Sequence, residues 1–150
     1  MKKQTVTFFG HKDTPKETEP TLRATLINLI ENHNAVKFYV GNNGNFDILV
    51  RNVLEELSVV YPIQYSVVLA YLPVQKDENE KLKNTILPEG IETVPKRFAI
   101  SYRNKWMIDH SDIVVAYVTH NFGGASQFKS LAERKGKRVI ELSAKSEYTK

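Results

Sequence analysis

Two kinds of sequence pattern alternate along the chain, and this alternation limits the fold more than any other feature. Five runs are rich in β-branched and aromatic residues, as strands are: 4–10, 36–40, 64–72, 113–118 and 138–142. Four intervening stretches repeat apolar residues at helical spacing: 17–34, 46–57, 97–110 and 123–135. Alternating strands and helices bury their apolar surfaces by forming a parallel sheet with helices on both faces. We therefore expect one Rossmann-like α/β domain over 1–150, a three-layer sandwich with a five-stranded parallel sheet in the order 3-2-1-4-5.

Three segments do not fit this alternation. The polar stretch 76–84 predicts a short helix or an exposed loop, and 85–96, with Pro88, Gly90 and Pro95, predicts irregular structure. The polar tail 143–150 predicts a frayed end.

Ligands bind to such sheets outside the carboxyl ends of the strands, where the strand order reverses. Here that point lies between the first and fourth strands, so the loops after Phe9, Val40 and Val118 are the candidates. These loops supply the following candidate ligand-binding residues: Gly10, His11 and Asp13; Gly41, Asn42, Asn43, Gly44, Phe46 and Asp47; Thr119, His120, Gly123, Gly124, Ala125 and Ser126.

The composition of these loops suits an anionic ligand. Glycine lets a backbone approach a ligand closely, and the second and third loops run into helix N-termini, which attract phosphate or carboxylate. Each glycine alone also fits an ordinary turn, and no loop is a P-loop or a GxGxxG fingerprint. Three such loops at one sheet edge favour a ligand cleft.

The helix before the fourth strand adds Arg97, Arg103 and Asn104 as candidates. A guanidinium there could reach a phosphate, because its planar fork is a strong donor. The alternative is a surface arginine paired with a nearby carboxylate.

Three loop side chains have more than one reading. His11 and His120 could meet across the switch point and bind phosphate, act as acid or base, or bond to backbone. Asp47 could cap the second helix or accept hydrogen bonds from a ribose. No tight ligand spacing indicates a metal, so we expect neither a metal nor a resident cofactor.

The composition and the N-terminal residues bear on the chemistry and the cellular location of the protein. There is no cysteine, which excludes disulfides and thiolate chemistry, and no apolar run approaches the length of a membrane span. Positions 1–4 lead into a strand pattern too short for a signal peptide, so we expect a cytoplasmic protein that does not bind membranes.

The net charge of +4 arises in the second half, where 76–150 carry fourteen Lys and Arg against ten Asp and Glu. This excess fits either a solvated surface or an anionic ligand held by that half. A net charge of +4 is low for a protein that binds nucleic acid, and the sequence contains no basic stripe interleaved with aromatic residues.

Four motifs occur in order: FGHKD at 9–13, FYVGNNGNFD at 38–47, YRNKWMIDHSD at 102–112 and GGA at 123–125. In this the chain resembles the small bacterial SLOG-superfamily proteins of the DUF1273/YpsA-like group, over nearly its full length. The resemblance implies a Rossmann-like fold with a nucleotide-type ligand in the cleft. The wider superfamily includes phosphoribohydrolases, the DNA-processing protein DprA and sensors of NAD-derived signals.

The resemblance also bears on catalysis. The phosphoribohydrolases carry an arginine that Arg103 resembles and a PGGxGTxxE motif after the fourth strand. Here the proline is missing and Gln127 or a neighbour stands where the glutamate should be. An amide cannot act as a carboxylate base, so the resemblance favours a non-catalytic module that senses or sequesters a nucleotide or an ADP-ribose-like molecule.

Two alternatives stay open at this stage. One is a nucleoside-monophosphate N-glycoside hydrolase that uses Arg103 and Asp47. The other is a nucleic-acid or protein adaptor. Because relatives often assemble, we also expect a homo-oligomer, with Tyr102, Trp106 or Phe122 as interface candidates.

Overall fold

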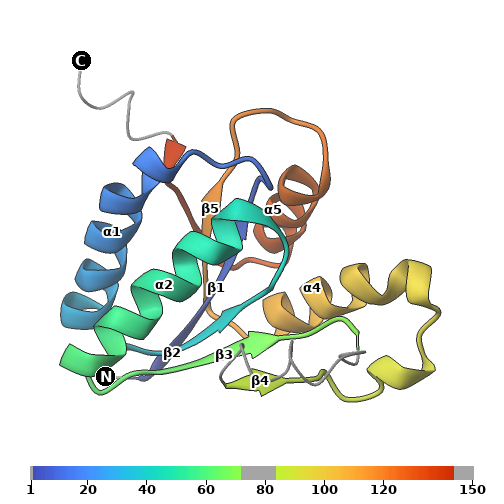
Figure 1. Ribbon diagram of the computed structural model, residues 1–150, viewed down its shortest axis with the longest axis horizontal. Helices are drawn as coiled ribbons and strands as arrows, with labels where there is room; N and C mark the ends of the chain where they lie inside the picture. Colours follow the sequence, from blue (N-terminus) through green and yellow to red (C-terminus); the bar gives the residue numbers. More distant parts are fainter. Residues whose placement is uncertain (1, 72–83, 144–150) are drawn as a thin grey trace.

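The sheet is parallel throughout and contains one strand more than the sequence pattern predicts. The computed structural model describes residues 2–71 and 84–143. Its six strands follow the order β4-β3-β2-β1-β5-β6 (Figure 1). Their bounds are β1 Gln4–Gly10, β2 Ala35–Val40, β3 Gln64–Val68, β4 Thr85–Ile86, β5 Ile113–Tyr117 and β6 Arg138–Glu141.

The prediction of five strands in the order 3-2-1-4-5 was wrong because it omitted β4. This strand pairs Thr85 with Val67 and Ile86 with Val68 of β3, within a segment predicted to be irregular. Two residues are too few to show a strand periodicity, and Pro88 and Gly90 follow closely. The other five strands keep their expected relative order, and the order reverses between β1 and β5.

Helices cover both faces of the sheet. In the described part of the chain the α-helices are α1 Glu19–Asn32, α2 Gly44–Val60, α4 Ala99–Asp109 and α5 Gly124–Arg134. A 3-10 turn over Lys16–Thr18 precedes α1, so the α-helix starts later than predicted, with Pro20 in its first turn. A second such turn, Lys96–Phe98, precedes α4 in the same way. The α/β sandwich expected from the alternating pattern is thus confirmed.

The core divides between the two faces of the sheet by strand alternation. Val6 and Phe8 of β1 face α1 and α2, where Leu22, Leu26 and Val50 are fully buried. Phe9 faces the other way and stacks on Phe128 of α5 at 5.7 Å between ring centroids. Each fully buried side chain of this size contributes about 1.5–3 kcal/mol. These packed layers fix where the strand ends, and therefore the loops, lie.

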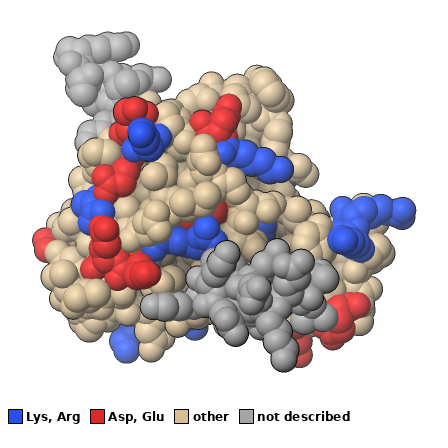
Figure 2. Space-filling view, in the orientation of Figure 1, with Lys and Arg blue, Asp and Glu red and all other residues tan. Residues whose placement is uncertain are grey.

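Acidic and basic side chains intermingle over α1 and α2 on the face shown in Figure 2. Arg23, for example, forms ion pairs with Glu19 and Glu56. The described part of this face therefore presents no continuous basic surface. Across residues 2–71 and 84–143, none of the helices combines the length and apolarity that crossing a membrane requires.

Two of the expectations lie almost entirely outside the described residues. These are the short helix or loop over 76–84, of which only Asn84 is described, and the frayed tail over 143–150, of which only Ser143 is described.

Candidate functional site

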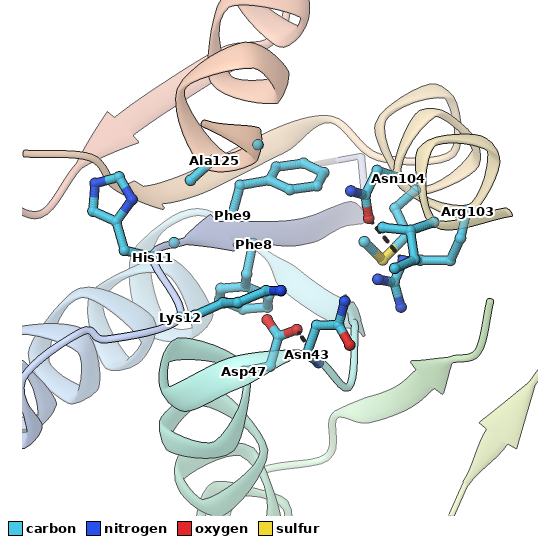
Figure 3. A pocket seen from close by; sticks show the side chains of 13 residues that line it. Phe8, Phe9, His11, Lys12, Asn43, Asp47, Arg103, Asn104 and Ala125 are labelled. Carbon is cyan, nitrogen blue, oxygen red and sulfur yellow. Dashed lines mark hydrogen bonds between the residues drawn. The ribbon is translucent and has the colours of Figure 1, made fainter. Parts of the chain in front are cut away.

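A cavity of about 210 Å³ opens at the carboxyl edge of the sheet, beside the switch point between β1 and β5 (Figure 3). It draws on the end of β1, the start of α2, the inner face of α4 and the first residues of α5. The lining residues are Phe8, Phe9, Gly10, His11, Lys12, Asn43, Asp47, Ile100, Arg103, Asn104, Met107, Gly124 and Ala125. The cavity lies where the topology of the sheet predicts a ligand site.

Arg103 is the most unusual wall residue, because its side chain is only 2% exposed. It occupies the buried face of α4 together with Ala99 and Met107, each four positions away, where an apolar residue is the normal choice. Its Nη1 donates to the carbonyl oxygen of Val68 at 2.8 Å. Burial lowers the pKa of the guanidinium, and the nearby Asp47 carboxylate offsets part of that shift.

Further hydrogen bonds fix the guanidinium without neutralising it. Its Nε donates to Oδ1 of Asn104 at 2.7 Å, and its Nη1 also donates to Oδ1 of Asn42 at 3.3 Å. No carboxylate among the described residues forms an ion pair with it. The Asp47 carboxylate acts on it from beyond ion-pair distance and compensates only part of the cost of burial, so a further anion in the cavity would be stabilising.

Asp47 lies on the adjacent wall and is also buried, at 8% exposed. Its Oδ2 accepts a hydrogen bond from the backbone N–H of Asn43, at 2.8 Å, next to the start of α2. Burial raises the pKa of the carboxyl to about 6, against the opposing effects of the Asn43 N–H, Arg103 and Arg51. The N-cap residue of α2 is Asn43, so Asp47 is not the cap itself but a carboxylate of the first turn that also lines the cavity.

Gly41 separates these two charged groups. A Cβ atom at this position would lie 2.8 Å from Oδ2 of Asp47 and 2.9 Å from Nη1 of Arg103. Both distances are shorter than real Cβ contacts allow. The missing side chain is therefore what lets the carboxylate and the guanidinium approach the end of β2 from two sides.

We predict that Gly41→Ala lowers the free energy of unfolding by about 1–3 kcal/mol, because the new methyl group overpacks this spot. Urea unfolding at pH 8 measures the change. Gly124→Ala is the matched control, since a Cβ there meets nothing within 4 Å, and it should leave stability within about 1 kcal/mol of wild type. Equal stability of Gly41→Ala and wild type would show that the two charged groups tolerate displacement.

The N-terminus of α5 contributes backbone donors that have no partner within the helix. The first helical hydrogen bond runs from the Gln127 N–H to the Gly123 carbonyl at 3.1 Å, so the N–H groups of 124–126 precede it. Gly123 has φ 91° and ψ 177°, a conformation open to glycine alone. It turns the chain so that Gly124 and Ala125 reach the cavity wall.

The two histidines do meet across the switch point. Their rings stack at 3.8 Å between centroids with an interplanar angle of 14°. His11 is buried and lines the cavity, whereas His120 lines a separate pocket of about 510 Å³ together with Thr119 and Ser126. Phe122, which is 69% exposed, stacks on the far side of His120 at 4.0 Å.

The predicted ligand residues fall into three groups. Eight line the cavity: Gly10, His11, Asn43, Asp47, Arg103, Asn104, Gly124 and Ala125. Four support the wall from behind or beside it: Gly41 and Asn42 next to Arg103, Gly44 against Lys12, and Phe46 under Gly10. Six are not in the wall: Asp13, Arg97, Thr119, His120, Gly123 and Ser126.

Arg97 and Arg103 were both predicted to bind a ligand, but only Arg103 is buried and lines the cavity. Arg97 is exposed and lies over the ring of Phe98, 4.8 Å from its centroid. Phe98 itself is 51% exposed. Neither arginine forms an ion pair among the described residues, so the surface-pair alternative does not hold for them there.

Sequence reasoning missed five wall residues: Phe8, Phe9, Lys12, Ile100 and Met107. Lys12 follows His11 directly, so its place in the first loop was a usable signal. Figure 3 shows the Lys12 and Asp47 side chains pointing into the same space. The four apolar residues could not be identified as wall residues from the sequence, because an apolar residue that lines a cavity has the same spacing as one in the core.

Within residues 2–71 and 84–143, no group of three or more histidine or acidic side chains could hold a metal ion. Comparison of the sequence with protein-family models and with curated proteins found no match. The chemistry of the site therefore rests on its own residues: a buried guanidinium, an ammonium, a buried carboxylate and free helix amides.

Proposed function

We propose that this protein binds a nucleotide-type small molecule, of the NAD-derived or ADP-ribose-like kind, in the cavity at the carboxyl edge of the sheet. It would act as a sensor or a sequestering module. Membership of the SLOG superfamily is part of this proposal and rests on the four sequence motifs. A cytoplasmic location and assembly into a homo-oligomer, for which the exposed ring of Phe122 is available, stay predictions.

The observation that carries the proposal is the buried guanidinium of Arg103, which has no carboxylate partner among the described residues. Removing a charge from water is costly unless an opposite charge compensates for it. A phosphate in the cavity would supply that charge and accept a charge-assisted hydrogen bond from the guanidinium. The site therefore favours an anionic ligand over a neutral one.

Two other wall elements suit the same phosphate. The Lys12 side chain adds a second cation, and the N–H groups at the start of α5 face an anion with the positive end of the helix dipole. The cavity, at about 210 Å³, is smaller than the roughly 300–1,000 Å³ of typical ligand pockets. We infer that it encloses a sugar phosphate and leaves the rest of the ligand outside.

Thermal unfolding against a panel of nucleotides tests the proposal. The panel contains AMP, ADP, NAD, ADP-ribose, cyclic ADP-ribose isomers, cyclic dinucleotides and, as the uncharged control, adenosine. A ligand at 100 times its Kd stabilises by about 2.7 kcal/mol, which raises Tm by about 5–10 °C at this size. We expect such a shift with at least one phosphate-bearing compound and none with adenosine. No shift with any compound would contradict the proposal.

The buried carboxylate of Asp47 favours one alternative, the N-glycoside hydrolase of nucleoside monophosphates. A group with a pKa of about 6 in a cavity can exchange a proton near neutral pH, as a general acid or base must. Chromatography of the bound compound separates the two functions. Recovery of intact nucleotide supports a binding module, whereas recovery of free base with sugar phosphate supports the hydrolase.

A further inference from the structure

Two successive backbone N–H groups after β5 are held by side chains rather than by a neighbouring strand. The Val118 N–H donates to Oε2 of Glu141 at 2.9 Å, and the Thr119 N–H donates to Nε2 of His11 at 2.9 Å. These bonds fix the path of the loop from β5 to α5. Both acceptors are titratable side chains, one a carboxylate and one an imidazole.

The bond to Thr119 assigns the state of the His11 ring. A histidine nitrogen accepts a hydrogen bond only when it carries no proton. His11 must therefore be neutral, with its proton on Nδ1. Protonation would place a hydrogen on Nε2 that faces the Thr119 N–H, so the bond would be lost.

The stacking of His120 on His11 also favours a neutral His11 ring. His120 lies on the face of His11 at 3.8 Å, and an added charge on either ring disfavours a charge on the other. Phe122 covers the far face of His120, which ties the same loop into the stack. The neutral ring of His11 thus suits both its bond and its neighbours.

The groups around His11 come from six parts of the chain: the loop after β1, α2, α4, β5 with its following loop, α5 and β6. Burial and His120 lower the pKa of its ring below the usual 6.5, while the carboxylates of Asp13 and Glu141 oppose them. The edge of Tyr117 on β5 packs at 6.3 Å. The Glu141 carboxylate is paired with Lys129 at 2.9 Å. Lys12, Asp47 and Arg103 share the cavity wall with His11.

Glu141 forms the constant part of this arrangement. Burial raises the pKa of its carboxyl, but hydrogen bonds from Ser143, the Val118 N–H and Lys129 outweigh burial, so the pKa is lowered overall. These bonds favour the ionised carboxylate, and the Val118 contact does not involve the His11 ring. Only the Thr119 contact switches.

We propose that His11 is a proton-sensitive positioning residue, which holds the β5–α5 loop and the first turn of α5 against the cavity when neutral and releases them when protonated. The same ring lines the cavity and binds the loop that leads to Gly124 and Ala125, so loop and wall move together. The effect on ligand binding rests on the proposed function, but the loop movement does not.

NMR on the ligand-free protein between pH 5 and 8 tests the loop movement. At pH 8 the long-range ¹H–¹⁵N spectrum should show His11 with its proton on Nδ1. As the pH falls, the Thr119 amide should lose about tenfold in hydrogen-exchange protection, corrected for the intrinsic rate. The midpoint should lie below 6.5, the ordinary histidine value. A proton on Nε2 at pH 8, or unchanged Thr119 protection, would overturn the proposal.

Variants separate the proton effect from simple packing. His11→Gln places a carbonyl oxygen near the position of Nε2, so the Thr119 bond should persist with no pH dependence. His11→Phe keeps a ring on His120 but has no acceptor, so Thr119 should be unprotected at every pH. His33→Gln, at the end of α1, is the control and should match wild type. A pH response that survives in His11→Gln would assign the switch to another group.

The consequence for binding is measured at pH 8 alone, where the charge of the probe does not change between variants. With AMP as probe, His11→Phe should bind at least about tenfold more weakly than wild type, and His11→Gln within about threefold of it. Equal affinity of His11→Phe and wild type would overturn the positioning role. If wild type itself does not bind AMP or the other panel compounds, the proposed function fails while the NMR result stands.

Discussion

Asp47→Asn is expected to raise the free energy of unfolding at pH 8 by about 3 kcal/mol, an increase in Tm of about 6–12 °C. Asparagine keeps an oxygen for the Asn43 N–H but carries no charge to bury. The magnitude follows from a pKa that burial raises from 3.8 to about 6, at about 1.36 kcal/mol per unit. Few single substitutions stabilise a protein this much.

The gain should depend on pH in a defined direction. Because the folded pKa lies above the unfolded one, the folded protein binds the proton more tightly, and stability is lost as the pH rises from 3.8 to about 6. Asparagine avoids this loss. The difference between variant and wild type should therefore grow by about 2 kcal/mol between pH 4.5 and pH 8 and then level off.

Urea unfolding at the two pH values measures the difference. Asp13→Asn, an exposed carboxylate on the neighbouring loop, is the control and should change stability by less than about 0.5 kcal/mol at either pH. A destabilised Asp47→Asn at pH 8 would mean that the attraction between Asp47 and Arg103 outweighs the cost of burial. A stabilised variant that no longer binds the panel compounds would show that this cost is retained for function.

Replacing Arg103 with methionine should weaken binding of the best panel compound by about 100-fold or more, because the variant removes the buried donor proposed for the phosphate. Methionine keeps an unbranched apolar stem on the buried face of α4. Stability at pH 8 should fall by about 1–3 kcal/mol, because the variant leaves the oxygens of Val68, Asn42 and Asn104 without this donor and removes the positive charge near Asp47. Isothermal titration calorimetry measures the affinity, and urea unfolding measures the stability.

Arg97→Met is the matched control for this experiment. Arg97 lies six positions earlier, in the 3-10 turn that precedes α4, and its guanidinium is exposed above Phe98. Its replacement should leave the affinity within about twofold of wild type. If the two variants lose affinity equally, the contribution of arginine is long-range attraction, and the buried geometry of Arg103 carries no special role.

Secondary structure was largely predictable because its signal is local. The helical spacing of Leu22, Leu26 and Leu29 reports one buried helix face whatever the rest of the chain does. β4 was not predicted because its signal is not local. Its two residues form a strand only because β3 lies beside them. The location of the cavity was also predictable, since it follows from the sheet order and the loops at its reversal.

The sequence by itself determined the layered α/β fold, the switch point and eight of the thirteen residues that line the cavity. Only the tertiary structure decided that Arg103 is buried and Arg97 is not, that Lys12 joins the wall, and that His11 accepts a hydrogen bond from Thr119. The spacing of apolar residues along a sequence shows which face of a helix or strand is buried. The charge state and partners of a buried group depend instead on atoms from distant strands and helices, which meet only when the chain has folded.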